Sequence, residues 1–182
     1  MRRITGGSSV YHDANGEVTY AVVASEKLFP RDVAESFAVI CRGIVYALRE
    51  LGLKAELAPI NDVVVGKKKI SGSAQVRREG ALLQHGTLLY NTDLEILARV
   101  LRAPKAKLAS HGVKSIYERV TTVSRELGRK VSREEVIEAL KKGFSKALNI
   151  TLTEGELTEK ELKLATRLRD ERYSREEWLF KR

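Results

Sequence analysis

Residues 69–90 of the chain read KISGSAQVRREGALLQHGTLLY. This stretch predicts two strands, at 69–76 and 81–90, because the Arg-Glu-Gly run at 78–80 is a turn signal between them. A connection this short joins antiparallel strands, since parallel strands need a long crossover. The chain is therefore predicted to fold around an antiparallel meander.

Three more strands are predicted before this hairpin. The first is 17–24, which is rich in β-branched and aromatic residues. The other two are 54–57 and 61–65, and the turn signal Gly66-Lys67 follows the second of them. A helix is predicted at 31–51, after Pro30 and before Gly52. Its apolar residues recur at helical spacing: Val33, Phe37, Ile40, Ile44, Leu48 and Leu51.

The second half of the chain is predicted to be mainly helical. A short helix is expected at 93–102, and helices are expected throughout the chain beyond Pro104, apart from a strand at 150–152. Capping boxes at Ser132 and Thr158 begin two of these helices. The predicted fold class is thus α+β, with two layers as in α/β-like folds. A mixed, largely antiparallel sheet is packed by helices, and the C-terminal segment is helical. We expect one domain over 1–182.

Composition limits the function classes. The chain has 182 residues, and no apolar run approaches the ~20 residues that span a bilayer. Its charged, polar start is unlike a secretory signal, so we expect a cytoplasmic protein without membrane contact. Cys41 is the only cysteine, which excludes an internal disulfide and a cysteine-built zinc site.

The net charge of +9 favours acidic partners. Nucleic acid is not expected among them, because basic residues alternate with glutamates and aromatic residues for base stacking are few. The segment from Arg2 to Asp13 suits a smaller anion. Its Gly6-Gly7 pair lets backbone N–H groups approach a phosphate, and its arginines can grip phosphate oxygens. The same residues could form a simple turn.

A second group of polar residues falls in the predicted meander. Strict alternation along 69–74 would place Lys69, Ser71 and Ser73 on one face, with Ile70, Gly72 and Ala74 behind them. Asn61-Asp62 on a neighbouring strand offers oxygen ligands of the kind that Mg²⁺ prefers. These are the parts of a phosphate-handling site.

Together these motifs resemble the lipoate-protein ligase family. The segment 3–7 with His12-Asp13, the pair Asn61-Asp62, and the segments 69–74 and 85–89 occur in that family's order. The segment 173–178 also resembles the end of the family's large catalytic domain. The resemblance covers essentially the whole chain and implies a biotin/lipoate ligase-like fold.

The resemblance implies a two-step reaction. Lipoate attacks ATP to give lipoyl-AMP, and a lysine of an acceptor protein then takes the lipoyl group. It also implies Mg²⁺ as a cofactor, because negative charge gathers on the phosphates in the transition state. Lys69 is the implied catalytic residue. The implied ligands are Arg3, Ser8, Ser9, Val10, Tyr11 and Lys69 for ATP; Gly7, Lys69 and His85 for lipoate; and Asn61 and Asp62 for the metal.

The implied acceptors are the lipoyl domains of 2-oxoacid dehydrogenase complexes and the glycine-cleavage carrier protein, which are acidic and match the positive net charge. The sequence departs from the family in three ways. The strands that precede the glycine loop are not in it, Ser8 replaces the third glycine, and the C-terminal accessory domain, a separate polypeptide in some relatives, is missing. We therefore expect weak ATP affinity and an exposed sheet edge or apolar surface near residues 1–25.

Other interpretations remain open. An octanoyl- or lipoyl-transferase would need a nucleophilic cysteine near the lysine motif, and the chain could instead be a non-catalytic fragment that binds lipoyl domains. Each motif also has a structural alternative. Lys69 could belong to a solvated lysine triplet at 67–69, His12 and His85 could be structural, Asn61-Asp62 could be a turn, and Cys41 could be packing.

Overall fold

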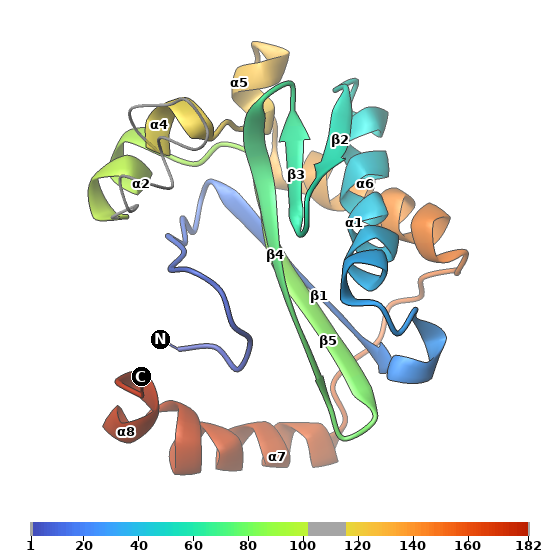
Figure 1. Cartoon of the computed structure of the whole chain (residues 1–182), viewed down its shortest axis with the longest axis vertical. Coiled ribbons are helices and arrows are strands. Elements are labelled where there is room, and N and C mark those ends of the chain that lie inside the picture. Colours follow the sequence, from blue (N-terminus) through green and yellow to red (C-terminus); the bar gives the residue numbers. More distant parts are fainter. Residues whose placement is uncertain (1, 102–115, 182) are drawn as a thin grey trace.

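A computed structural model describes residues 2–101 and 116–181. At its centre is a five-stranded sheet with the order β1-β5-β4-β3-β2, in which every pair of neighbours is antiparallel (Figure 1). The predicted fold class is therefore confirmed. The strands are β1 (Glu17–Ser25), β2 (Ala55–Ala58), β3 (Asp62–Val65), β4 (Lys68–Arg78) and β5 (Ala81–Leu89).

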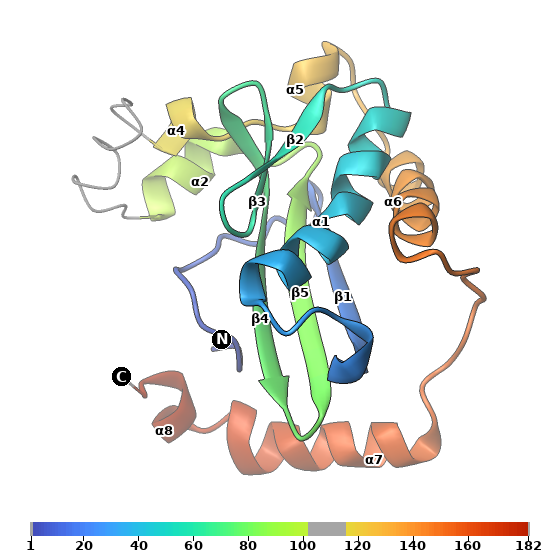
Figure 2. The same ribbon diagram turned by 45° about the vertical axis from the view of Figure 1, so that its right-hand side comes forward.

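Two long helices, α1 (Val33–Glu50) and α6 (Arg133–Leu148), form the second layer on one face of the sheet (Figures 1 and 2). The side chain of Asp32 caps α1 by accepting a hydrogen bond from the Glu35 backbone N–H. The apolar stripe of α1 forms most of the core, with Ile40, Ile44 and Leu48 fully buried. The helix prediction at 31–51 is thus confirmed within two residues at its start.

The two helices approach closely at a pair of glycines. A Cβ added at Gly143 would lie 2.2 Å from the backbone oxygen of Gly43, and one added at Gly43 would lie 2.4 Å from the Phe144 ring. The backbones therefore meet without a side chain between them, which allows Phe144 to pack on Tyr20 of β1 with ring centroids 5.1 Å apart.

A β-bulge interrupts the pairing of β4 with β3. Val63 lies opposite Ser71, but the next residue, Val64, lies opposite Lys69, so the register skips Ile70. A bulge adds one residue to a strand, so a residue before the bulge and a residue after it no longer face the sides that strict alternation predicts for them. Ile70 and Ser71 are both buried as a result, although they are consecutive in the strand.

The other face of the sheet is bordered by chain segments from both ends of the sequence. The N-terminal segment 2–16 runs along it, with α2 (Leu94–Val100) and α4 (Ile116–Arg119) at one end and α7 (Glu159–Leu168) and α8 (Glu176–Leu179) at the other (Figures 1 and 2). The Trp178 indole donates a 2.9 Å hydrogen bond to the carbonyl of Arg2. The remaining elements are η1 (Glu26–Leu28), α5 (Val123–Leu127) and η2 (Arg169–Tyr173).

Some predictions for the second half were wrong. No strand forms at 150–152, because Asn149 ends α6 in a left-handed conformation and the following residues are exposed as far as Thr158, with no strand beside them in the described sheet. The chain beyond 104 is also not all helix, since residues 120–122 are extended and 149–158 are coil. The predicted helix at 93–102 spans Leu94–Val100, and residues 102–115 lie outside the described part. Ser132 and Thr158 begin α6 and α7 as predicted, but only Thr158 forms the full capping box, because the Glu135 side chain pairs with Arg129.

Candidate active site

The register of the sheet brings residues from four strands into one row. Asp62 lies opposite Gly72, Gly72 opposite Thr87, and Thr87 opposite Thr19. Directly opposed residues of antiparallel strands project from the same face. The adjacent row on that face contains Ala74, His85 and Ala21. This face lies away from α1, whose Cys41 and Ser36 contact Ser73 and Gln75 on the other side.

Lys69 reaches this row because of the bulge. Its Nζ lies 2.5 Å from Asp62 Oδ1, and the side chain passes directly over Gly72. Asp62 Oδ2 lies 3.8 Å from a guanidinium nitrogen of Arg119, the last residue of α4. The Lys69, Asp62 and Arg119 side chains are 32, 16 and 18% exposed. The three form a partly buried cluster, the cationic corner, at one end of the sheet face.

The structure therefore corrects the prediction of which sheet face Lys69 lies on. Alternation predicts Lys69, Ser71 and Ser73 together, with Gly72 behind. The structure instead places Lys69 over Gly72, while Ser73 faces the helices and bonds the Tyr20 hydroxyl at 2.7 Å. The bulge at Ile70 is the physical reason, because it reverses the facing of Lys69 relative to the rest of β4.

His85 lies farther along the same face, against the N-terminal segment. Its Nε2 lies 2.6 Å from the hydroxyl of buried Thr5. Burial, followed by the positive charges of Arg3 and His12, lowers the pKa of His85. The ring is therefore neutral near pH 7, and it lies between Ala74 and Ala21 in its row.

The glycine loop has the turn conformation expected of it. Gly7 has φ +107°, and the Arg3 guanidinium donates hydrogen bonds to the carbonyls of Gly6 and Ser8, the latter at 2.7 Å. A Cβ at Gly7 would lie 2.7 Å from that guanidinium. Ser8, Ser9 and Val10 follow as exposed residues, and Tyr11 is half-buried. Within the described residues, no hydrogen bond or ion pair joins this loop to Lys69, so its predicted ATP contacts stay a prediction.

His12 ties the end of this loop to the sheet. Its Nδ1 contacts Oε1 of Glu17, the first residue of β1. Burial raises the pKa of Glu17, and the hydrogen bond from His12 opposes that shift. Of the open interpretations of His12, its contacts therefore match the structural histidine.

The donor set for a metal is small. Asp62 offers one carboxylate, and the Asn61 amide already donates a 2.6 Å hydrogen bond to the Ser73 carbonyl, which leaves its amide oxygen as an acceptor. In the part of the chain that the structure describes, no group of three or more His, Cys, Asp or Glu side chains could hold a metal. One carboxylate and one amide oxygen suit Mg²⁺ that is held mainly by substrate phosphates and water.

Sequence reasoning missed Arg119. It lies 50 residues beyond Lys69, and nothing near it resembles a motif. One signal was available, the β-branched run Val120-Thr121-Thr122, which continues directly from it. This run pairs with β4: Val120 forms a parallel bridge with Lys69, and the Thr121 N–H donates a 2.9 Å hydrogen bond to the Lys69 carbonyl.

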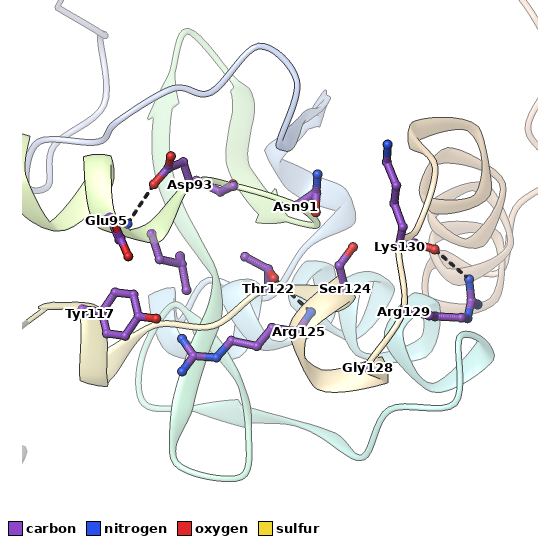
Figure 3. A pocket seen from close by; sticks show the side chains of 12 residues that line it. Asn91, Asp93, Glu95, Tyr117, Thr122, Ser124, Arg125, Gly128, Arg129 and Lys130 are labelled. Atoms are coloured by element: carbon purple, nitrogen blue, oxygen red, sulfur yellow. Dashed lines mark hydrogen bonds between the residues drawn. The ribbon is translucent and has the colours of Figure 1, made fainter.

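An open hollow lies apart from the cationic corner, between the end of β5, α4 and α5 (Figure 3). Arg125 lies over the Tyr117 ring at 4.9 Å on one side of it, and Arg129 pairs with Glu135 at 2.5 Å beyond the other side. None of the residues predicted for the site lines this hollow. We therefore assign it no part in the chemistry.

The fold defines the class of protein. A biotin protein ligase of Aquifex aeolicus shares it at a TM-score of 0.54 and 21% identity, over 74% of this chain and 50% of that one. A bipartite lipoate protein ligase of Thermoplasma acidophilum, from a structural analysis of that ligase and its E2 lipoyl domain, matches at a TM-score of 0.84 and 42% identity, over 97% of this chain and 68% of that one. A lipoate-protein ligase A bound with ATP matches at 0.83 and 39%, over 97% and 70%. The chain thus has the fold shared by biotin and lipoate ligases.

The sequence comparisons specify the family. Residues 1–145 match the family of the lipoyl protein ligase A/B catalytic domain. Lipoate-protein ligase A subunit 1 of Thermoplasma acidophilum is 41% identical over 97% of this chain and 70% of its own length. Octanoyltransferase LipM of Symbiobacterium thermophilum is 36% identical over 98% and 72%. The chain belongs to the lipoyl protein ligase A/B catalytic-domain family, whose members here include both ligases and octanoyltransferases.

No helix within the described ranges is long and apolar enough to cross a membrane.

Proposed function

We propose that the chain is the catalytic subunit of a lipoate-protein ligase. A lipoate carboxylate oxygen bonds to the α-phosphorus of ATP, and pyrophosphate leaves with the electron pair of the broken P–O bond. The amine of an acceptor lysine then attacks the acyl carbon. A C–N bond forms, the C–O bond to AMP breaks, and the amine loses a proton.

The observation that favours a ligase over a transferase is the position of Cys41, the only cysteine of the chain. A transferase would carry the acyl group on a thioester, which needs an accessible thiolate. Cys41 is buried on α1, on the helix side of the sheet, and its sulfur contacts Ser73 and Gln84 at 3.5 and 3.4 Å. Burial raises the pKa of the Cys41 thiol, which disfavours the thiolate. Activation by ATP needs no thiol.

In this proposal Lys69 stabilises the negative charge that develops on the acyl carbonyl and the α-phosphate. Arg3 and the loop from Ser8 to Tyr11 hold the nucleotide, and Gly7 and His85 border the lipoate. Asn61 and Asp62 would hold Mg²⁺, which when bound neutralises phosphate charge. Ala74, directly opposite His85, is a small residue, which supports an acyl site on this face of the sheet.

The proposed acceptors are lipoyl domains of 2-oxoacid dehydrogenase complexes and the glycine-cleavage carrier protein. The Thermoplasma relative is a bipartite ligase that was analysed alongside its E2 lipoyl domain, which supports both such an acceptor and a separate accessory polypeptide. The net charge of +9 supports steering toward acidic domains.

The direct test of the whole reaction is transfer to a purified lipoyl domain, followed by mass spectrometry. With ATP, Mg²⁺ and lipoate, and with the accessory polypeptide present or absent, we expect the domain to gain one lipoyl group. Omitting ATP should abolish the gain. A gain that needs an octanoyl-carrier protein and ignores ATP would establish the transferase instead.

Changing Cys41 to alanine should leave acyl transfer intact. The substitution removes a small buried group, so the free energy of unfolding should fall by roughly 1 kcal/mol. The measurement is the rate of lipoyl-domain modification together with a denaturant titration. Loss of that rate, with a thioester trapped on the unmodified chain, would show that Cys41 is a nucleophile.

Changing Gly72 to alanine should damage the site more than the fold. The new Cβ would lie 2.5 Å from Lys69 Nζ and 2.6 Å from its Cε, so the ammonium must leave its place beside Asp62. A 1 Å displacement of a reacting group can cost about 10²-fold in rate, so we expect adenylation to fall by at least about ten-fold. The melting temperature should change little, because the displaced atoms end a flexible side chain.

The matched control is Gly155→Ala, since an added Cβ at Gly155 meets nothing within 4 Å. This variant should retain the full adenylation rate. A Gly72→Ala enzyme as active as Gly155→Ala would show that the position of Lys69 over Gly72 has no part in the reaction.

A further inference from the structure

The Asp62 carboxylate has two cationic neighbours on opposite oxygens. Lys69 Nζ lies 2.5 Å from Oδ1, and the Arg119 guanidinium lies 3.8 Å from Oδ2. All three side chains are at least two-thirds buried, so water screens these charges less than at an open surface. The partners of Asp62 therefore decide what charge the corner presents to a ligand.

The charge of the corner depends on Arg119. Lys69 and Asp62 alone would form a neutral pair, a poor site for a phosphate. With Arg119 the cluster has a net charge of +1. A guanidinium can also bind a carboxylate through two parallel N–H donors, which the single ammonium of lysine cannot do. Arg119 is thus suited to hold Asp62 by itself when Lys69 turns toward a substrate.

The backbone next to Arg119 is fixed against the strand that contains Lys69. Thr121 donates its N–H to the Lys69 carbonyl at 2.9 Å, and Val120 forms a bridge with Lys69. Val120 and Thr121 are buried, and the Thr121 hydroxyl donates a 2.6 Å hydrogen bond to Glu126. The segment 119–121 therefore fixes the backbone of Arg119 relative to the backbone of Lys69, the two residues that contact Asp62.

We propose that Arg119 is a positioning residue that acts through Asp62. In the resting site Asp62 contacts Lys69. When an acyl phosphate binds, Arg119 keeps the carboxylate and Lys69 is released to the ligand. This inference rests on the proposed ligase function, because the ligand class is an acyl-adenylate. It predicts that the effect of losing Arg119 depends on the presence of Asp62.

The test is binding of a non-hydrolysable lipoyl-adenylate analogue, measured by calorimetry in EDTA so that no metal contributes. Arg119→Gln should weaken binding by about ten-fold, because Asp62 then holds Lys69 alone. Asp62→Asn should bind more tightly than the unmodified chain, since Lys69 is free. The double variant should match Asp62→Asn. Arg119→Lys should recover only part of the affinity, because it restores the charge but not the two parallel donors. Arg125→Gln, which removes an equal charge at the separate hollow, is the matched control and should bind normally.

A double variant as weak as Arg119→Gln would overturn the proposal, because Arg119 would then act on the ligand and not on Asp62. Weaker binding by Asp62→Asn than by the unmodified chain would also overturn the proposal. If a thermal melt shows that Arg119→Gln is unfolded, the affinity of Asp62→Asn alone serves as the test. Failure of the unmodified chain to bind the analogue would instead contradict the proposed ligase function.

Discussion

Replacing Lys69 with alanine is expected to lower the rate of lipoyl-adenylate formation by on the order of 10²-fold or more. Lys69 Nζ is the cation that the bulge of β4 aims over Gly72, beside Asp62. Without it, charge on the phosphate and acyl oxygens would develop against the remaining Asp62 carboxylate. The measurement is single-turnover formation of lipoyl-AMP from lipoate and ATP.

The control for this change is Lys67→Ala in the same lysine triplet. Lys67 is exposed in the turn before β4, so its loss removes an equal charge without touching the site. We expect it to keep the normal rate. Equal rates for the two variants would mean that the triplet is only a solvated turn, the alternative that the sequence left open.

Replacing Gly143 with leucine is expected to have the largest effect on stability. Any Cβ there would lie 2.2 Å from the Gly43 carbonyl oxygen and 2.7 Å from the Ala47 nitrogen, both backbone atoms that cannot rotate away. Helices α1 and α6 must separate, and the Phe144 contact with Tyr20 is lost with them. We expect the free energy of unfolding to fall by about 3 kcal/mol or more.

Denaturant titration followed by circular dichroism measures this loss. Lys141→Ala on the exposed side of the same helix is the control, and it should change the free energy by no more than about 0.5 kcal/mol, because an exposed ion pair such as Lys141 with Glu138 contributes little. A Gly143→Leu chain as stable as this control would show that the two helices do not depend on the glycine contact.

The meander from β2 to β5 could be predicted from sequence because its information is local, whereas the pairing of β1 with β5 could not. Turn residues at 66–67 and 78–80 separate the strands, and short connections fix their antiparallel order. The error at 150–152 has the opposite origin. Ile150-Thr151-Leu152 has the composition of a strand, but a strand also needs a neighbour. Ile150 and Leu152 remain 45 and 47% exposed in the structure.

The geometry of the candidate site was harder to predict than the sheet. Lys69 and Asp62, which the motifs assign to one site, contact each other, and their roles stay a prediction. Alternation, however, assumes an uninterrupted strand, and the bulge at Ile70 depends on packing that no local pattern records. Arg119 reaches the site through the pairing of Val120 with Lys69, a contact between segments 50 residues apart. Pairing between residues that lie far apart in the chain is hard to predict from a single sequence.

The measurement that tests the proposed function most directly is lipoate-dependent exchange of labelled pyrophosphate into ATP, at saturating ATP and Mg²⁺. Exchange reports formation of the acyl-adenylate alone and needs no acceptor protein. The ligase account predicts exchange that depends on lipoate, persists in Cys41→Ala and is lost in Lys69→Ala. No exchange by the folded chain, together with octanoyl transfer that Cys41→Ala abolishes, would contradict it.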